Sequence, residues 1–294
     1  VTLDEVNALA RTWIGKRNRV VTVAAPAKDS ATVPTEGAIL AAFRKADATT
    51  VSAYTETVSD APLVGTIPRP GRIVAESTVT DLGATIWTLS NGARVVLKPT
   101  TFKADEVLMR AYSPGGSSLV SDDDYPSAML ATTIAERGGL GDVSAIDLGK
   151  KLTGKQARAN VFIDGMSEGL SGGGSTKDLE TIFQLAHLRF TAPRRDSSAF
   201  LAFKAQVAPF FANRANSPDA VFSDTVMLTL AQHHPRAQPV SQALFDRVSF
   251  GKAFDIYRDR FADASDFTFV FVGSFTLDRM RPLVEQWLAT LPAT

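Results

Sequence analysis

The sequence predicts an α+β fold, in which a mixed or antiparallel sheet is packed by helices. Three observations predict it. Apolar runs of strand length occur beside amphipathic helical segments, the two kinds do not alternate strictly, and an Asn-Gly pair joins two apolar runs as in an antiparallel hairpin. The chain has 294 residues, of which 45% are hydrophobic. It is therefore long enough for one or two domains with a sizeable core.

The N-terminal part of the chain is expected to contain two helices and one strand. Thr2 and Glu5 fit a capping box that begins a helix over 3–14. The apolar run 20–25 is expected to be a buried strand, and Thr35 is expected to cap a helix that ends near residue 45. Because the chain begins one residue before a helix cap, we expect it to be a fragment of a longer protein.

Residues 59–71 are punctuated by Pro and Gly and are expected to be a linker. Strands and helices follow it, and Ser90-Asn91-Gly92 is expected to form the hairpin turn. Strands are expected at 73–80, 85–89, 94–98, 106–112, 157–163 and 267–272. Helices are expected at 126–136, 144–152, from Ser175 or Thr176 to 190, and at 196–214, 218–232, 246–261 and 277–288.

Four segments of the chain resemble the pitrilysin/insulinase family of zinc peptidases. The hairpin Leu89–Leu97 and the strand that ends in Tyr112–Ser117 are similar to the opening of a domain in that family. The segment Phe269–Thr276, with the helix after it, is similar to the way such domains end. Asp147–Lys155 resembles the third domain of the four-domain bacterial branch.

The resemblance implies a domain organisation and a role. Residues 72–294 would be a complete, inactive peptidase-like domain, and residues 1–58 would be the C-terminal end of a preceding domain plus a connecting helix. The implied function is that of a non-catalytic fragment of a zinc-dependent peptidase, which helps to enclose and position peptide substrate. An extended peptide can bind such a domain by adding a strand to an open sheet edge.

The zinc motif of the family is absent from this chain. The catalytic domain of the family carries H-x-x-E-H on a helix, with two zinc ligands four residues apart and a glutamate that activates water. Here the matching positions are Leu130, Thr133 and Ile134. No histidine precedes His187, and no glutamate that could be the third ligand lies between Glu180 and Glu285.

The sequence therefore predicts no catalytic residue, no metal ligand and no cofactor in this chain, and it identifies no substrate-binding residue. Zinc would belong to the parent's missing catalytic domain. The expected partners are the catalytic half of the same polypeptide and a peptide substrate. Similar four-domain bacterial proteins suggest a periplasmic or otherwise exported location, with the cytoplasm as the alternative.

Several other patterns suggest sites but favour a structural role. Ser167 lies in a G-x-S-x-G sequence, the nucleophile motif of serine hydrolases, but the glycine-rich run after it starts a helix poorly. We therefore expect a loop or strand edge there. Residues 171–175 are expected to be a flexible turn, with an anion site before the next helix as the alternative.

The remaining candidates are also expected to be structural. His233 and His234 are adjacent and cannot chelate one metal as an i, i+4 pair does, and His187 lies in an amphipathic helix. The run Asp122–Asp124 lacks the spacing of a calcium loop and is expected to be a solvated loop that starts a helix. Core positions are expected for Phe200, Phe203, Phe210 and Phe211.

Composition excludes further classes of function. Lys and Arg number 31 and Asp and Glu number 31, which argues against a nucleic-acid surface. The chain has no cysteine, which excludes disulfides, cysteine-bound metals and a thiol nucleophile. No apolar run reaches the roughly 20 residues of a membrane span. Two alternatives remain open: a catalytically inactive peptide-binding or scaffold protein with the same fold, and an independent serine hydrolase that uses Ser167.

Overall fold

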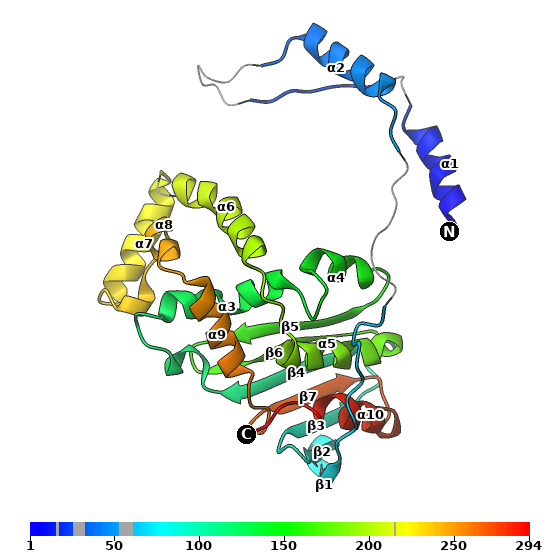
Figure 1. The fold of residues 1–294 in the computed structure, drawn as a ribbon, viewed down its shortest axis with the longest axis vertical. Helices are drawn as coiled ribbons and strands as arrows, with labels where there is room; N and C mark the ends of the chain where they lie inside the picture. Colours follow the sequence, from blue (N-terminus) through cyan, green and yellow to red (C-terminus); the bar gives the residue numbers. More distant parts are fainter. Residues whose placement is uncertain (16–17, 26–32, 53–60, 215) are drawn as a thin grey trace. The chain divides into compact units, whose positions relative to one another are not determined.

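The computed structural model describes residues 1–15, 18–25, 33–52, 61–214 and 216–294, and the chain forms two compact units, Val1–Thr57 and Val58–Thr294 (Figure 1). The smaller unit contains α1 (Leu3–Trp13) and α2 (Glu36–Ala48). Thr2 and Glu5 form the predicted capping box of α1, and Thr35 caps α2 by accepting a hydrogen bond from a backbone N–H. None of the described residues of this unit is buried, so they form no core of their own.

The predicted strand at 20–25 is wrong. These residues form no strand, and Val20, Val21 and Val23 are exposed. A strand requires a hydrogen-bonded neighbour, and no described residue of the smaller unit provides one. An apolar run alone therefore did not determine the structure of this segment.

The described part of the predicted linker is packed on the larger unit. Val64 is buried in its core, and the N–H of Gly71 donates to the carbonyl of Glu285 over 2.9 Å. The side-chain amide of Gln286 donates to the carbonyl of Pro68. Residues 61–71 thus belong structurally to the larger unit, while residues 59–60 lie outside the described ranges.

A seven-stranded mixed sheet forms the centre of the larger unit and confirms the predicted α+β class. Its spatial order is β1-β2-β3-β7-β4-β6-β5 (Figure 1). Only β3 and β7 pair in parallel. The strands are β1 (Ile73–Val79), β2 (Ala84–Leu89), β3 (Arg94–Pro99), β4 (Val107–Pro114), β5 (Ala157–Ile163), β6 (Ser167–Gly174) and β7 (Thr268–Gly273).

Most helices follow the predicted segments, but the helix Gln242–Asp246 was not predicted, and the one predicted to begin at residue 246 begins at Phe250. They are α3 (Tyr125–Gly138), α4 (Ala145–Lys151), α5 (Leu179–Thr191), α6 (Ser197–Arg214), α7 (Pro218–Leu230), α8 (Gln242–Asp246), α9 (Phe250–Arg260) and α10 (Leu277–Leu283). A π-helical turn over Val284–Leu288 extends α10. No helix in the described ranges combines the length and apolar character that crossing a bilayer would require.

Aromatic side chains fill the core between the sheet and the helices. Phe183 of α5 stacks on Phe271 of β7 with ring centroids 4.9 Å apart. Phe190, also on α5, makes an edge-on contact of 4.9 Å with Phe267. Burial of such side chains is worth about 1.5–3 kcal/mol each, so α5 is a main anchor of the helical layer.

The phenylalanines of α6 were predicted to be core residues, and this is wrong for one of them. Phe200 and Phe211 are buried and Phe203 is half-buried, but Phe210 is 59% exposed. Neighbouring residues on a helix point about 100° apart, so Phe210 and Phe211 cannot face the same contact.

The predicted hairpin is confirmed, and it also fixes the end of the domain. β2 and β3 pair antiparallel around a turn in which Gly92 has φ 90°. The side-chain amide of Asn91 donates to the carbonyls of Leu288, over 2.9 Å, and Leu291, over 3.1 Å. One side chain therefore ties the opening hairpin to the final helix.

The predicted flexible turn at 171–175 is wrong, because most of it belongs to β6, a strand paired on both sides. The glycines of β6 explain both the error and the structure. A Cβ on Gly169 would lie 1.9 Å from the carbonyl oxygen of Ala111, and one on Gly172 would lie 2.0 Å from that of Arg158. Glycine lowers strand propensity, but here it lets three strands approach closely.

Candidate functional site

Helix α3 carries positions 130, 133 and 134, which the resemblance aligns with the zinc motif. Positions 130 and 134 are one helical turn apart and share a face, as two zinc ligands on a helix would. That face is apolar in this chain. Ile134 is 3% exposed and packs with Phe200 of α6 and Ala253 of α9, and Leu130 is packed against the same cluster. The residues present offer no donor atoms and do not fit a zinc ion.

None of the three histidines lies on α3, and they occupy different environments. His187 is buried in α5, and its Nδ1 lies 3.0 Å from the carbonyl oxygen of Trp287. Burial lowers the pKa of His187. His233 and His234 lie exposed in the turn after α7, where Nδ1 of His234 accepts from the N–H of Arg236. Within the described ranges, no three His, Asp or Glu side chains form a group that could hold a metal ion.

Ser167 lacks the setting of a hydrolase nucleophile. It is the first residue of β6, at the hairpin from β5, and not on a turn between a strand and a helix. Ser167 therefore lies at the end of a strand that is paired on both sides, not in a loop or at a strand edge, and the hydrolase alternative loses its structural basis. The acidic run before α3 is also structural. Asp122 pairs with Arg236 over 2.6 Å, and Asp124 pairs with Lys252.

A buried carboxylate beside Ser167 was not singled out from the sequence. Glu168 is 3% exposed, accepts a hydrogen bond from the N–H of Gly116, and has an oxygen 3.9 Å from the guanidinium of Arg260. Burial raises the pKa of Glu168. Gly115 and Gly116, which form the turn after β4, both have positive φ. The hydrogen bond from the N–H of Gly116 to the carboxylate of Glu168 holds this turn in place. We see in it a structural role, because its contacts are all internal.

The two faces of the sheet differ in their covering. Along β4 the exposure alternates strictly, with Val107, Met109 and Ala111 buried under the helices and Leu108, Arg110 and Tyr112 exposed. By strand register, Arg158, Asn160 and Phe162 of β5 share the exposed side. We call this side the open face. The guanidinium of Arg110 lies over the ring of Phe162, 4.7 Å from its centre.

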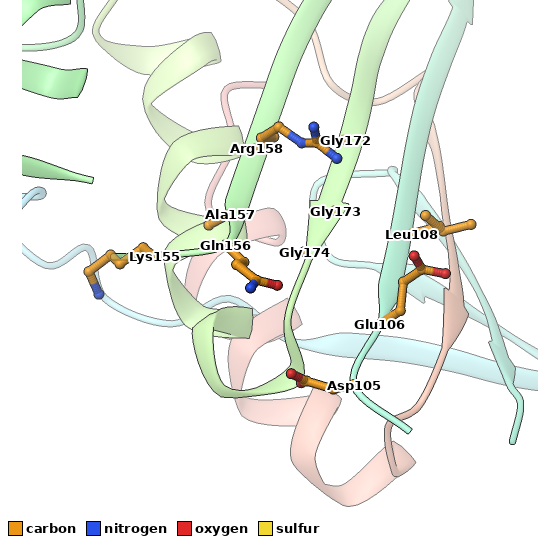
Figure 2. Close-up of a pocket in the computed structure, with 10 residues that line it drawn as sticks. All are labelled: Asp105, Glu106, Leu108, Lys155, Gln156, Ala157, Arg158, Gly172, Gly173 and Gly174. Atoms are coloured by element: carbon orange, nitrogen blue, oxygen red, sulfur yellow. The ribbon is translucent and has the colours of Figure 1, made fainter. Parts of the chain in front are cut away.

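A cavity of about 390 Å³ lies at one end of the open face. Figure 2 shows its floor at Gly172–Gly174 of β6, between Arg158 on the β5 side and Glu106 and Leu108 on the β4 side. Since glycines lack side chains, the floor is bare backbone. The cavity opens where β4, β5 and β6 begin or end.

The edge of the sheet at β5 is closed by side chains. The N–H of Val161 donates to Oε1 of Glu136 over 3.1 Å, and Nε of Arg189 donates to the carbonyl of Ala159 over 3.0 Å. The hydroxyl of Tyr257 donates to the carbonyl of Arg189 over 2.8 Å, which holds the C-terminal end of α5 in place. Satisfying the edge in this way prevents another strand from pairing there. At the opposite edge, residues 74–78 of β1 are exposed.

Comparison with known proteins places the fold. No protein-family model matches the chain. A zinc protease PQQL-like protein of Arabidopsis thaliana is 29% identical over 231 residues, which are 78% of this chain and 22% of that protein. The chain thus spans about a fifth of the length of this curated relative.

Solved structures show the same architecture. The periplasmic protease PqqL from Escherichia coli matches 89% of this chain and 29% of its own, with TM-score 0.69 and 21% identity. The ferredoxin protease FusC, solved in complex with Arabidopsis ferredoxin, matches 90% of this chain and 29% of its own, with TM-score 0.65 and 20% identity. A peptidase M16 inactive domain from Pseudomonas fluorescens matches 72% of this chain and 52% of its own, with TM-score 0.57 and 16% identity.

The chain therefore has the fold of an M16 peptidase domain, and it is a distant relative of PqqL-like zinc proteases over about a fifth of their length.

Proposed function

We propose that this chain is a non-catalytic part of a zinc-dependent M16 peptidase, in which it helps to enclose and position peptide substrate. The observation that carries the proposal is the apolar packing of α3. Where a catalytic domain needs two histidines, this chain has Leu130 and the buried Ile134. The zinc ion and the activated water would belong to a catalytic domain outside this chain.

The domain organisation is part of the same proposal. Residues 72–294 would be the inactive domain, residues 59–71 its connection, and residues 1–58 the end of a preceding domain. The smaller unit supports this assignment, because α1 carries an apolar stripe of Leu3, Val6, Leu9 and Trp13 that is exposed throughout. An amphipathic helix needs a partner surface. A periplasmic location is proposed by analogy with the E. coli protein.

Peptide could reach this sheet in two ways. An extended chain could add to the exposed edge at β1, because the β5 edge is closed by Glu136 and Arg189. Alternatively, peptide could lie on the open face, which no helix of the larger unit covers in the described ranges. Both modes hold a peptide without cleaving it.

The test uses the purified chain. Elemental analysis after dialysis against zinc-containing buffer and then metal-free buffer is expected to find no retained zinc. Quenched fluorescent peptides are expected to stay intact, while fluorescence anisotropy detects their binding. Hydrolysis that a chelator abolishes would overturn the proposal, and failure to bind any peptide would remove the positioning role.

A further inference from the structure

The strands place charge of one sign on the open face. Their cationic side chains all point away from the helices, and these are Arg94, Lys98, Arg110 and Arg158. The acids within the seven strands are Glu76 and Glu168, and both lie on the side that the helices cover. The open face is therefore positive although the chain as a whole is neutral, and it favours an anionic ligand.

One contact between side chains divides this face. The guanidinium of Arg110 on β4 lies over the ring of Phe162 on β5, so the two side chains meet above β6, the strand between them. The ring of Phe162 also covers Gly169, because a Cβ at that glycine would lie 2.8 Å from Cζ of the ring. An extended ligand therefore cannot run the whole length of β6. The free part of the strand is its end at Gly172–Gly174, where the cavity lies.

The cavity over Gly172–Gly174 has the size of a ligand pocket. Its volume of about 390 Å³ falls within the usual range of about 300–1,000 Å³. Strand register sets Leu108 opposite Arg158 across β6, and Glu106 and Gln156 come just before β4 and β5, at the mouth. Figure 2 shows Arg158 reaching from β5 toward β6 and the amide of Gln156 turned toward the glycine floor. The inner end of the cavity is thus apolar on one side and cationic on the other.

Arg158 is the cation of this cavity that remains available to a ligand. Its side chain makes no ion pair, hydrogen bond or ring contact with the part of the chain that the structure describes. Lys155 points away from the floor, and its Nζ donates to a threonine hydroxyl over 3.2 Å (Figure 2). The acids are engaged as well. Asp105 accepts hydrogen bonds from two neighbouring hydroxyl groups, which lower its pKa, and Glu106 pairs with Lys103 over 2.8 Å.

We propose that the cavity binds the C-terminal end of a peptide, with the terminal carboxylate on Arg158 and the last side chain against Leu108. The proposal rests on the proposed function and names the part of the peptide that is held. Guanidinium groups bind carboxylates through paired hydrogen bonds. A chain end fits because the contact between Arg110 and Phe162 blocks continuation along β6. Gln156 lies two residues before Arg158, a step of about 7 Å, so its amide can bond to the main chain of the peptide nearer the mouth.

Fluorescence anisotropy with three peptides labelled at the N-terminus tests the proposal. The first consists of neutral residues and ends in Leu with a free carboxylate, which is ionised at pH 7. The second has the same sequence with a C-terminal amide, and the third is also amidated but ends in Glu. We expect the free acid to bind about tenfold more tightly than its amide, and raised ionic strength to reduce this difference.

Variants of the cavity separate its two contacts. Arg158→Gln should bring the affinities of the acid and the amide to within about twofold of each other, and Arg158→Lys should keep part of the preference. Leu108→Ala should weaken both peptides that end in Leu to the same degree. The matched control is Arg94→Gln, which removes the same charge from the open face outside the cavity and should leave the ratio unchanged. Equal circular dichroism spectra and melting temperatures would show that these variants fold.

Several results would overturn the proposal. Equal binding of the acid and the amide would leave the peptide-positioning function standing and show that the carboxylate site is wrong. If no peptide binds, both fail. A preference for the acid that survives Arg158→Gln would place the carboxylate elsewhere. Binding of the amidated Glu peptide as tight as that of the acid would assign Arg158 to side-chain carboxylates. Displacement by inorganic phosphate at a lower concentration than by unlabelled acid peptide would assign the cavity to a phosphate group.

Discussion

Writing the zinc motif back into α3 tests whether its apolar face is structural. The variant replaces Leu130 by His, Thr133 by Glu and Ile134 by His, which restores H-x-x-E-H. The side chains at 130 and 134 point into the contact with α6 and α9 and not toward a site open to solvent. We therefore expect the variant to lose stability and to gain no zinc binding.

The magnitude follows from the burial of Ile134, which is 3% exposed. Removing most of a buried isoleucine costs about 2–5 kcal/mol, and burying an imidazole without a partner adds about 1–3 kcal/mol. A loss of about 3–8 kcal/mol is expected, against a total stability of about 5–15 kcal/mol for a typical domain. The variant would thus lose a large part of its free energy of unfolding.

Urea denaturation with and without zinc measures the outcome. A site with micromolar affinity would stabilise the folded state by about 2.7 kcal/mol at 100 μM free zinc, whereas we expect no shift. The control installs the same pair at exposed positions of α6, Ala202→His with Gln206→His, which should cost little stability. A zinc-dependent gain in the α3 variant alone would refute the reasoning, because it would show that these side chains converge on an accessible site.

Other predictions concern single residues. Asn91→Ala should destabilise the domain by about 1–3 kcal/mol in urea, because it removes two hydrogen bonds to the C-terminal helix, whereas Asn213→Ala at an exposed site should be near neutral. Gly169→Ala should cost more than about 2 kcal/mol, because its Cβ would meet a carbonyl at 1.9 Å, while Gly149→Ala, with open space around it in α4, should be neutral or stabilising. Since burial depresses the folded-state pKa of His187 below its unfolded value, the unfolded state takes up the proton first, and stability should fall as pH drops below about 6.5. A His187→Gln variant should show a shallower loss from pH 7 to 5, and an unchanged slope would contradict this.

Most elements could be predicted from the sequence because their signals are local. Capping residues such as Thr2 and Thr35 satisfy nearby N–H groups, and the Asn-Gly pair sets its own turn. β6 could not be predicted, because its glycines give no local strand signal and the strand exists only through pairing with β4 and β5. The apolar run at 20–25 failed for the reverse reason, since strand propensity without a partner forms no strand.

The candidate site was harder to predict because it depends on contacts between distant segments. The apolar side chains at positions 130 and 134 could be read directly from the sequence. The closure of the β5 edge could not, because it brings Glu136 from α3 and Arg189 from α5 onto a strand between them in sequence. The positive charge of the open face could not be predicted either, because it depends on which alternate residues of each strand face the helices.

One physical cause links the sheet's construction to its proposed use. β6 fits between β4 and β5 because Gly169, Gly172 and Gly173 have no Cβ, and at Gly172–Gly174 the bare backbone forms the floor of the hollow described above as the cavity. Replacing a floor glycine to fill the hollow would therefore also strain the sheet. The walls can be changed without that cost, since Leu108 and Arg158 are exposed. Peptide added at β1 would bond to main-chain groups and tolerate an amidated end, whereas peptide in the cavity would need its terminal carboxylate, so C-terminal amidation separates the two modes.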